Sequence, residues 1–528
     1  MRSMTCSGTK AFCALVIAAL GLFTAITQGQ SGQGSGSSPQ IVQETGLAPI
    51  DVGLRDHDMP RDARTAADAN RARRDRSDAT LRYLRGSVIV KFKAGTASSA
   101  VSSATRQVSG VMGASRPSSA NFDIVDIPME SDAEAAAATL RARPDVEYAQ
   151  PRYLNHAMVR PNDPLYTNQW NFPAIDMERA WDIQPGATSD IIVAVLDSGV
   201  AFRTVTLRYT SRFPFRVDNG PLYPALGTVD VPFAAAPELG ASGSTRFVLP
   251  RDFIWDNELP VDLDSHGTHV TGTIGQLTNN SVGGAGMAYN VRIMPVKIIQ
   301  GVWDDVFDSP FAGTDDIVAR GIRYAADNGA KVINLSIGRS EGGAAPTVTD
   351  AMRYAIGKGV FIAVASGNTR DTGNRPNRLG DGAATIDGMM VVGAVGRTLD
   401  AAYYSTTSPS VEIAAPGGDQ RAGGSSAGIL QQTINLDLLE TFERPVSQFG
   451  PPRADSFGFY YFQGTSMAVP HVSGFAALLM QQGITSPAAV EAAIKQYATD
   501  KGAAGRDDVY GFGLINPRAT LRGLGLAK

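Results

Sequence analysis

From about Asp163 onward, short runs of apolar residues alternate with segments of helical pattern. The runs have the length of single buried strands and span 191–196 (IIVAVL), 332–335 (VINL), 360–365 (VFIAVA) and 389–395 (MMVVGAV). Between them, Thr314 can cap a helix that ends near Gly329, and Thr349 can cap another that ends near Gly357. Strands that alternate with helices predict a doubly wound, mostly parallel sheet flanked by helices, which is an α/β fold. Functional sites of such sheets gather at the carboxyl ends of the strands.

Composition excludes several classes of protein. The chain has 528 residues, of which 43% are hydrophobic and 19% charged, and its formal net charge is −4. At about 150 residues per domain this length holds two to four domains. The charged fraction is too low and the charge balance too even for a chain that is disordered throughout, and the slightly acidic balance argues against a nucleic-acid partner. The two cysteines, Cys6 and Cys13, both lie near the N-terminus, which excludes a disulfide-stapled scaffold.

The N-terminus has the form of a secretory leader. Arg2 and Lys10 precede an uncharged, mostly apolar run over 11–27, so we predict a signal peptide over 1–30. An uncleaved anchor is the alternative, although the run is slightly short for a membrane span of about 20 residues. We expect a secreted protein, extracellular or periplasmic, without a membrane partner once the leader is removed. Residues 31–86 are first rich in Gly and Ser and then in Arg and Asp, which predicts a disordered charged linker.

A small folded unit is predicted over 87–158. Ser131 and Glu134 form a capping box ahead of an Ala-rich helix, which Pro144 ends. Other elements are expected as strands at 88–92, 122–127 and 146–149 and a helix at 96–108. This order predicts a small α+β domain of ferredoxin-like type, with helices on one face of an antiparallel sheet.

A few polar residues in Gly-rich segments are the candidates for chemistry. Asp197 follows the 191–196 strand, and His266 and His269 lie in the segment HGTHVTG. Ser466 opens the helical segment GTSMAVPH, which ends in His471, and the free N–H groups at a helix start favour developing negative charge. Taken singly, Asp197 also suits a turn or a helix cap, and Ser466 also suits a helix cap.

Taken together, the segments 197–199 (DSG), 266–270 (HGTHV) and 464–471 (GTSMAVPH) resemble the three active-site blocks of the subtilisin-like serine proteases, in that family's order. The resemblance extends from about 163 to 521 and implies a catalytic domain over 159–528. It implies that Ser466 is the nucleophile, His266 the general base and Asp197 its orienting acid, with Asn368 as oxyanion donor and no catalytic metal. His269 and His471 are expected to be packing residues.

The same resemblance implies polypeptide substrates. Their backbone would pair with Ser336, Ile337 and Gly338 on one side, and with Ala365, Ser366 and Gly367 on the other. Small residues on both walls predict room for a medium or large apolar side chain. The small domain resembles the inhibitory propeptide of these proteases, so it is expected to be an intramolecular inhibitor of a monomeric enzyme. Its closing segment, 151–161, would run through the cleft and be cut there.

Two features depart from compact family members. Surplus residues lie at 202–255 and 418–462, either as a rim around the cleft or as surface insertions. The segment 277–284 resembles the family's calcium loop, with these expected ligand residues: Gln169, Thr278, Asn280, Val282 and Gly284. The usual acid is missing from 201–205. Asp163 could replace it, and a structural calcium and a plain Asn-rich turn both remain open.

Two alternatives to an active protease follow from the same residues. The chain could be a non-catalytic family member that acts as a binding protein, or an enzyme that cuts only itself. The intact set of Asp197, His266, Ser466 and Asn368 favours an active enzyme over a scaffold.

Overall fold

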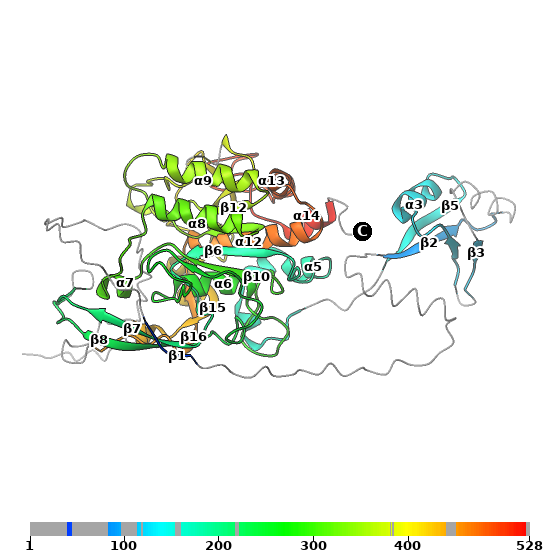
Figure 1. Cartoon of the computed structure of the whole chain (residues 1–528). Helices are drawn as coiled ribbons and strands as arrows, with labels where there is room; N and C mark the ends of the chain where they lie inside the picture. Colours follow the sequence, from blue (N-terminus) through cyan, green and yellow to red (C-terminus); the bar gives the residue numbers. More distant parts are fainter. Residues whose placement is uncertain are drawn as a thin grey trace, which may run out of the picture. The chain divides into compact units, whose positions relative to one another are not determined.

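The computed structural model describes residues 40–44, 83–96, 113–117, 120–153, 160–216, 221–380, 382, 385–439 and 450–523. The chain divides into two compact units, an N-terminal and a C-terminal one (Figure 1), and each is described by itself. The predicted signal peptide and most of the predicted linker lie outside the described residues. No helix within the described ranges is both long and apolar enough to cross a membrane.

A seven-stranded sheet forms the centre of the C-terminal unit, and all its neighbouring strands are parallel. Its order is β14 (Val411–Pro416), β13 (Met389–Val395), β12 (Phe361–Ala365), β11 (Val332–Leu335), β6 (Ile192–Asp197), β10 (Arg292–Lys297) and β9 (Arg251–Asp252). Strand β6 pairs with β11 on one side and β10 on the other, so the strand order reverses there. The predicted α/β class is confirmed, and ligands are expected at this switch point.

Helices cover both faces of this sheet. Helices α8 (Asp315–Asp327) and α9 (Pro346–Gly357) lie on one side and α6 (His266–Gly275) on the other (Figure 1), while α6 packs against the long buried helix α12 (Thr465–Gln481). Thr314 precedes α8 as predicted, but α9 begins before Thr349. Proline is suited to the first helical position, so Pro346 starts α9 instead. The remaining helical segments are η1 (Pro164–Asn168), α4 (Asn171–Ala174), α5 (Met177–Trp181), α7 (Val302–Val306), η2 (Arg370–Thr372), α10 (Gln420–Gly423), η4 (Ser425–Ala427), α11 (Leu436–Leu439), α13 (Pro487–Gln496) and α14 (Pro517–Gly523).

The first surplus segment, 202–255, is part of the core. It forms the antiparallel pair β7 (Val205–Ser211) and β8 (Gly227–Phe233), and it also supplies β9. Leu207, Tyr209 and Phe233 are buried in the main hydrophobic cluster. On the other edge of β7 lies β1 (Gln40–Glu44). The prediction that 31–86 is disordered is therefore wrong at β1, because this strand gains its ladder from a distant segment that local composition does not reveal.

The second surplus segment, 418–462, contains a two-stranded antiparallel sheet. Strand β15 (Ile429–Ile434) packs on α6, and β16 (Phe457–Phe462) leads directly to the start of α12. Ala454 contacts the first surplus segment, because it exchanges backbone hydrogen bonds with Pro232 and Ala234. The two surplus segments therefore support each other.

The N-terminal unit is a four-stranded antiparallel sheet with one described helix. The sheet order is β3 (Gly113–Ser115), β4 (Asp123–Asp126), β2 (Tyr83–Phe92) and β5 (Val146–Tyr153), and α3 (Ala133–Arg141) packs on β2 and β5. This confirms the predicted α+β domain. Its β2 begins four residues before the predicted boundary at 87, and most of the predicted helix at 96–108 lies outside the described residues. The cap of α3 is Asp132 rather than Ser131, since the Asp132 carboxylate accepts from the Glu134 N–H at 2.9 Å.

Candidate active site

Asp197 ends strand β6 at the switch point of the sheet, and it is fully buried. Its Oδ1 accepts a hydrogen bond from the Ser198 N–H and lies 2.7 Å from Nδ1 of His266. Gly267 allows this close approach, because a Cβ there would lie 2.1 Å from the Gly199 carbonyl oxygen. A buried carboxylate on Nδ1 orients the imidazole and leaves its other nitrogen, Nε2, for a different partner.

His266 is the first residue of α6, and its side chain is 24% exposed. Burial lowers the pKa of His266, but the charge and hydrogen bond of Asp197, with the charges of Asp264 and Asp262, raise it to about 9. The surroundings of the imidazole therefore stabilise its cationic form, which is the form a base takes after it has accepted a proton.

Asp262, which the sequence analysis did not single out, holds the turn that carries His266. Its Oδ1 accepts from the Ser198 hydroxyl and the Ser265 N–H, each at 3.0 Å, and its Oδ2 accepts from the Thr268 N–H and hydroxyl at 2.9 and 2.6 Å. Ser265 has a left-handed backbone with φ of 93°, a strained conformation that these hydrogen bonds support. The only sequence signal was an aspartate four positions before the histidine.

Ser466 is the second residue of α12 and lies against Ser336, which follows β11. Pro470 lacks the N–H that would otherwise bond to the Ser466 carbonyl, and the Ser336 hydroxyl donates to that carbonyl instead, at 2.7 Å. The Ser466 hydroxyl in turn donates to the Ser336 carbonyl at 2.9 Å. Because β11 is the neighbour of β6, Ser466 and the Asp197–His266 pair lie at the same edge of the sheet.

Ser336 is itself held by a buried asparagine that the sequence analysis missed. The Asn334 Nδ2 donates to the Ser336 hydroxyl at 2.9 Å, and the Asn334 Oδ1 accepts from the Ser473 hydroxyl at 2.8 Å. All three side chains are fully buried. A single polar residue inside the apolar run VINL was the available signal, since a buried amide requires partners.

Asn368 lies next to the start of α12. Its Oδ1 accepts from both the N–H and the hydroxyl of Thr465, each at 2.9 Å. This caps the first helical N–H and leaves the Ser466 N–H as the next free donor of the helix. The Nδ2 of Asn368 lies 3.4 Å from the position that a Cβ on Gly464 would occupy. Because glycine has no side chain, the space beside this Nδ2 stays free.

The two predicted substrate-binding walls are joined by Asn377, another residue that the sequence analysis missed. Its Nδ2 donates to the carbonyls of Ile337 and Ala365 at 3.1 and 2.7 Å. A Cβ on Gly338 would lie 2.2 Å from this Nδ2, so the asparagine packs directly on the glycine. Asn377 therefore occupies part of the space that the small residues leave open.

Comparison with known proteins identifies the family. A family model described as "Subtilase family" matches residues 188–513, which include the edge of the sheet just described. The chain belongs to the subtilase family. A second model, described as "Fervidolysin N-terminal prodomain", matches residues 69–152. The chain is thus a serine protease of the subtilase family with an N-terminal prodomain.

Two relatives found by sequence agree with this assignment. The "Thermophilic serine proteinase" of Bacillus sp. (strain AK1) is 30% identical over 82% of this subtilase and 86% of its own length. The "Extracellular protease" of Xanthomonas campestris pv. campestris is 29% identical over 70% of this chain and 58% of its own. The crystal structure of fervidolysin from Fervidobacterium pennivorans is 24% identical, with a TM-score of 0.49, over 84% of this chain and 61% of its own.

The two other histidines of the subtilase's C-terminal unit are structural. His269 is fully buried, stacks on Phe462 with ring centres 4.2 Å apart, and has its Nε2 near two backbone carbonyls. His471 is also buried, between the Met467 carbonyl and the Asn171 side chain. Burial lowers the pKa of His269 to about 3 and that of His471 to about 4, so both stay neutral. The expectation that they are packing residues is confirmed.

The predicted calcium loop of the subtilase makes many hydrogen bonds of its own. Gln169 Oε1 accepts from the Ala285 N–H at 2.7 Å, and Asn280 Oδ1 accepts from the Val282 N–H at 2.9 Å. The Thr278 hydroxyl accepts from the Gly286 N–H at 3.0 Å. Within the described residues, no group of three or more His, Cys, Asp or Glu side chains could hold a metal ion.

Two carboxylates nevertheless lie at this loop. Asp163 accepts from the N–H groups of Asn279 and Asn280, and Glu238 Oε1 accepts from the Asn280 side chain. Both acids are buried, and burial together with the charge of Asp163 raises the pKa of Glu238 to about 7. Glu238 Oε2 is buried without a hydrogen bond among the described residues, beside Gly283. Two adjacent buried acids and an unpaired carboxylate oxygen suit a hard cation such as calcium.

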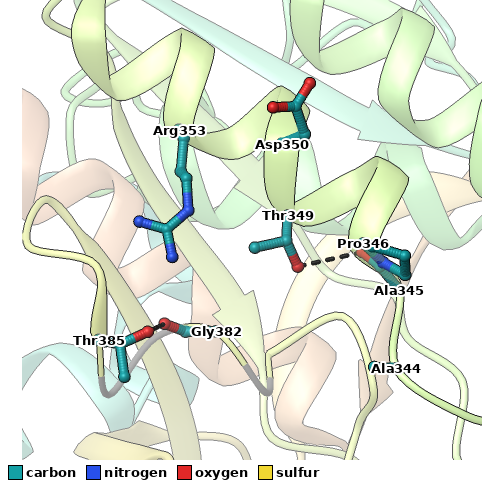
Figure 2. A pocket seen from close by; sticks show the side chains of 8 residues that line it. All are labelled: Ala344, Ala345, Pro346, Thr349, Asp350, Arg353, Gly382 and Thr385. Carbon is teal, nitrogen blue, oxygen red and sulfur yellow. Dashed lines mark hydrogen bonds between the residues drawn. The ribbon is translucent and has the colours of Figure 1, made fainter.

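A surface hollow of about 370 Å³ lies at the start of α9, with Thr349, Arg353, Gly382 and Thr385 in its lining (Figure 2). It contains none of the predicted catalytic or substrate-binding residues. Two of its hydroxyls are bonded locally, since Thr349 donates to the Ala345 carbonyl and Thr385 to the Gly382 carbonyl. It is therefore separate from the candidate site.

Proposed function

We propose that this subtilase is a secreted serine endopeptidase, extracellular or periplasmic, made as a precursor that removes its own prodomain. One observation carries the proposal: Oδ1 of Asp197 lies 2.7 Å from Nδ1 of His266, at the sheet edge where Ser466 begins a helix. Three side chains of these types, in this order, are what nucleophilic acyl transfer by serine requires.

The proposed reaction begins when the Ser466 hydroxyl turns from the Ser336 carbonyl to Nε2 of His266. His266 accepts the proton as the serine oxygen attacks the peptide carbonyl, and Asp197 stabilises the resulting imidazolium. His266 then gives the proton to the leaving amine, and an acyl-enzyme remains on Ser466. Water, activated by the same imidazole, releases the acid and restores the serine.

The oxyanion of each tetrahedral intermediate would be stabilised by two donors. One is the Ser466 N–H at the start of α12, and the other is Nδ2 of Asn368. The hydrogen bonds from Thr465 to Oδ1 of Asn368 support this assignment, because they fix which end of the amide is available as a donor. Such a donor contributes roughly 10²–10³ in kcat, a magnitude measured in this same protease family.

The prodomain is proposed to be an intramolecular inhibitor whose closing segment occupies the cleft until it is cut. The walls 336–338 and 365–367 would bind substrate backbone as an added strand. Calcium, if bound by Asp163, Glu238, Asn280 and the carbonyls of the 278–284 loop, would neutralise the two acids and stabilise the loop; it takes no part in the reaction.

Replacement of the nucleophile tests the proposal. We expect Ser466→Ala to lose casein hydrolysis by at least about 10³-fold and to lose reaction with a serine-directed fluorophosphonate. Ser426→Ala, at an exposed serine outside the candidate site, should still react with the fluorophosphonate. Full activity of the Ser466→Ala enzyme would reject the nucleophile, and a wild-type chain that never reacts would favour a binding protein. A chain that reacts but does not cleave casein would favour an enzyme that cuts only itself.

A further inference from the structure

Strand β1 lies near the N-terminus of the chain but belongs to the C-terminal unit, where it pairs with β7. Gln40 lies opposite Arg208 of β7, Ile41 opposite Leu207 and Glu44 opposite Val205, with a bulge between Ile41 and Gln43. In the sequence, β1 precedes the prodomain, and residues 45–82 separate it from β2. In the proposed precursor, one propeptide would therefore contain both the prodomain and β1, the strand that pairs with β7 of the first surplus segment.

The β7–β8 pair is a preformed acceptor for such a strand. Val205, Leu207 and Tyr209 are buried on one face of β7, and Tyr209 stacks on Phe307 with ring centres 4.7 Å apart. Arg208 points to the opposite, exposed face, where its ion pair with an aspartate on β8 measures 2.8 Å. Because a slip of one residue would exchange these faces, the register of β7 is fixed by the core.

The edge of β7 that faces away from β8 presents unpaired backbone donors and acceptors unless a strand covers it. An extended segment satisfies them through main-chain hydrogen bonds, which is the physical basis of strand addition. In this chain the segment that covers the edge is β1, in the antiparallel register described above.

We propose that β1 is a second attachment point of the propeptide, which holds it on the catalytic unit after the chain has been cut between the two domains. This inference rests on the proposed function and extends it to the release of activity. A propeptide that binds through both its prodomain and β1 rebinds intramolecularly whenever one contact opens. Activity is then released only when both contacts are lost or the linker 45–82 is cut.

A disulfide experiment tests the pairing without any protease activity. The full-length Ser466→Ala chain carrying Gln40→Cys and Arg208→Cys should form a disulfide, because directly opposed residues of an antiparallel pair have Cα atoms about 4.5–5.5 Å apart. The matched control replaces Arg208→Cys with Asp230→Cys. Asp230 lies opposite Arg208 on β8, one strand further away, so its Cα is about 9–10 Å from that of Gln40 and should not cross-link.

A release experiment tests the consequence. Ile41→Pro with Val42→Pro removes two consecutive N–H groups, at least one of which faces β7, so β1 should no longer pair. The control, Ala66→Pro with Ala67→Pro, places the same two prolines in the linker. In full-length, exported protein that has cut itself, we expect the cut propeptide to dissociate about tenfold faster or more from the β1 variant than from the wild type and the control. Gel filtration of the processed protein and the lag before casein hydrolysis both report this rate.

The outcomes separate this inference from the proposed function. If the wild type never cuts itself, the proposed function fails, whereas the disulfide result still tests the pairing. If the wild type cuts itself but the β1 variant releases its propeptide at the wild-type rate, the second attachment is refuted and the protease assignment stands. Failure of the Gln40–Arg208 disulfide, or equal cross-linking to Asp230, would also refute it.

Discussion

The proton affinity of His266 is governed by burial and by the carboxylates around it. Asp197 contacts the imidazole directly, while Asp262 and Asp264 act on it through charge alone. A base with a raised pKa is a stronger proton acceptor, but a smaller fraction of it is neutral at a given pH below that pKa. The same charges that stabilise the imidazolium in the reaction therefore move the working range of the enzyme toward alkaline pH.

We predict that activity rises with pH through an apparent pKa above 6.5. Since the pKa of His266 is raised to about 9, the imidazole is cationic and inactive below that range and becomes neutral as pH increases through it. The pH profile of kcat/KM measures the free enzyme, and NMR titration of the His266 imidazole in Ser466→Ala measures the group itself. His269 and His471 serve as internal references, because they should not titrate there. An imidazole pKa at or below 6.5 would contradict the prediction.

Asn377 is predicted to limit the side chain accepted before the scissile bond. Asn377→Ala removes the amide that packs on Gly338, so kcat/KM for large apolar residues should rise about tenfold relative to alanine at that position. Peptide p-nitroanilides that differ only at this residue provide the measurement. The control is Asn328→Ala, which removes an amide at the end of α8.

An unchanged ratio of large to small substrates would show that Asn377 does not border the pocket. The free energy of unfolding should fall by about 1–3 kcal/mol in the Asn377→Ala variant, because two carbonyls lose their donor. Thermal unfolding distinguishes this loss of stability from the change in substrate preference.

At the scale of elements, the first surplus segment provides both a strand of the main sheet and a buried acid beside the predicted calcium loop. Its Glu238 accepts a hydrogen bond from the Asn280 side chain, and its backbone carbonyl accepts from the Leu277 N–H at 2.7 Å. In the proposed calcium site, Glu238 would take the place of the acid that is missing after Asp197. This explains how a loop of family-like sequence can keep a negative environment without the usual residue.

We predict that calcium stabilises the protein through Glu238. In the Ser466→Ala background, which prevents self-digestion, calcium at about a hundredfold excess over Kd should raise the free energy of unfolding by about 2.7 kcal/mol, and EGTA should abolish the effect. Glu238→Gln should remove most of this calcium dependence, whereas Glu258→Gln, an exposed glutamate just after that surplus segment, should keep it. Equal melting temperatures in calcium and EGTA for the parent protein would exclude a calcium site.

Sequence patterns predicted elements well wherever local properties decide the structure. The strands at 332–335 and 389–395 have the predicted bounds, because they are buried on both faces and are followed directly by Ser336 and Gly396. The prediction that Thr349 caps α9 is wrong, because the helix already begins at Pro346, a residue suited to the first helical position. Strand β1 and the bridging role of Asn377 depend on partners far away in the sequence, so no local pattern could predict them.

At the scale of the whole molecule, the prodomain precedes the catalytic unit in the chain, as the proposed self-cleavage between them requires. The match to the prodomain family ends at residue 152, and the match to the subtilase family begins at residue 188. The proposed cut falls in the segment between them. This segment includes Asn162 and Asp163, whose side chains accept hydrogen bonds from N–H groups of the 279–281 loop. A new N-terminus near Asn162 would therefore be tied to the catalytic unit immediately after cleavage.

We predict that purified wild-type protein carries a new N-terminus between 154 and 163, and that Ser466→Ala keeps an uncut junction between prodomain and catalytic unit. Cleavage by the chain's own serine removes the prodomain without disturbing the bonds of Asp163, so the cut protein should retain its fold. N-terminal sequencing of both proteins, purified under the same conditions, is the measurement. The same new N-terminus in Ser466→Ala would mean that another protease makes the cut, and a wild-type junction that remains intact would mean that the prodomain is a permanent part of the enzyme.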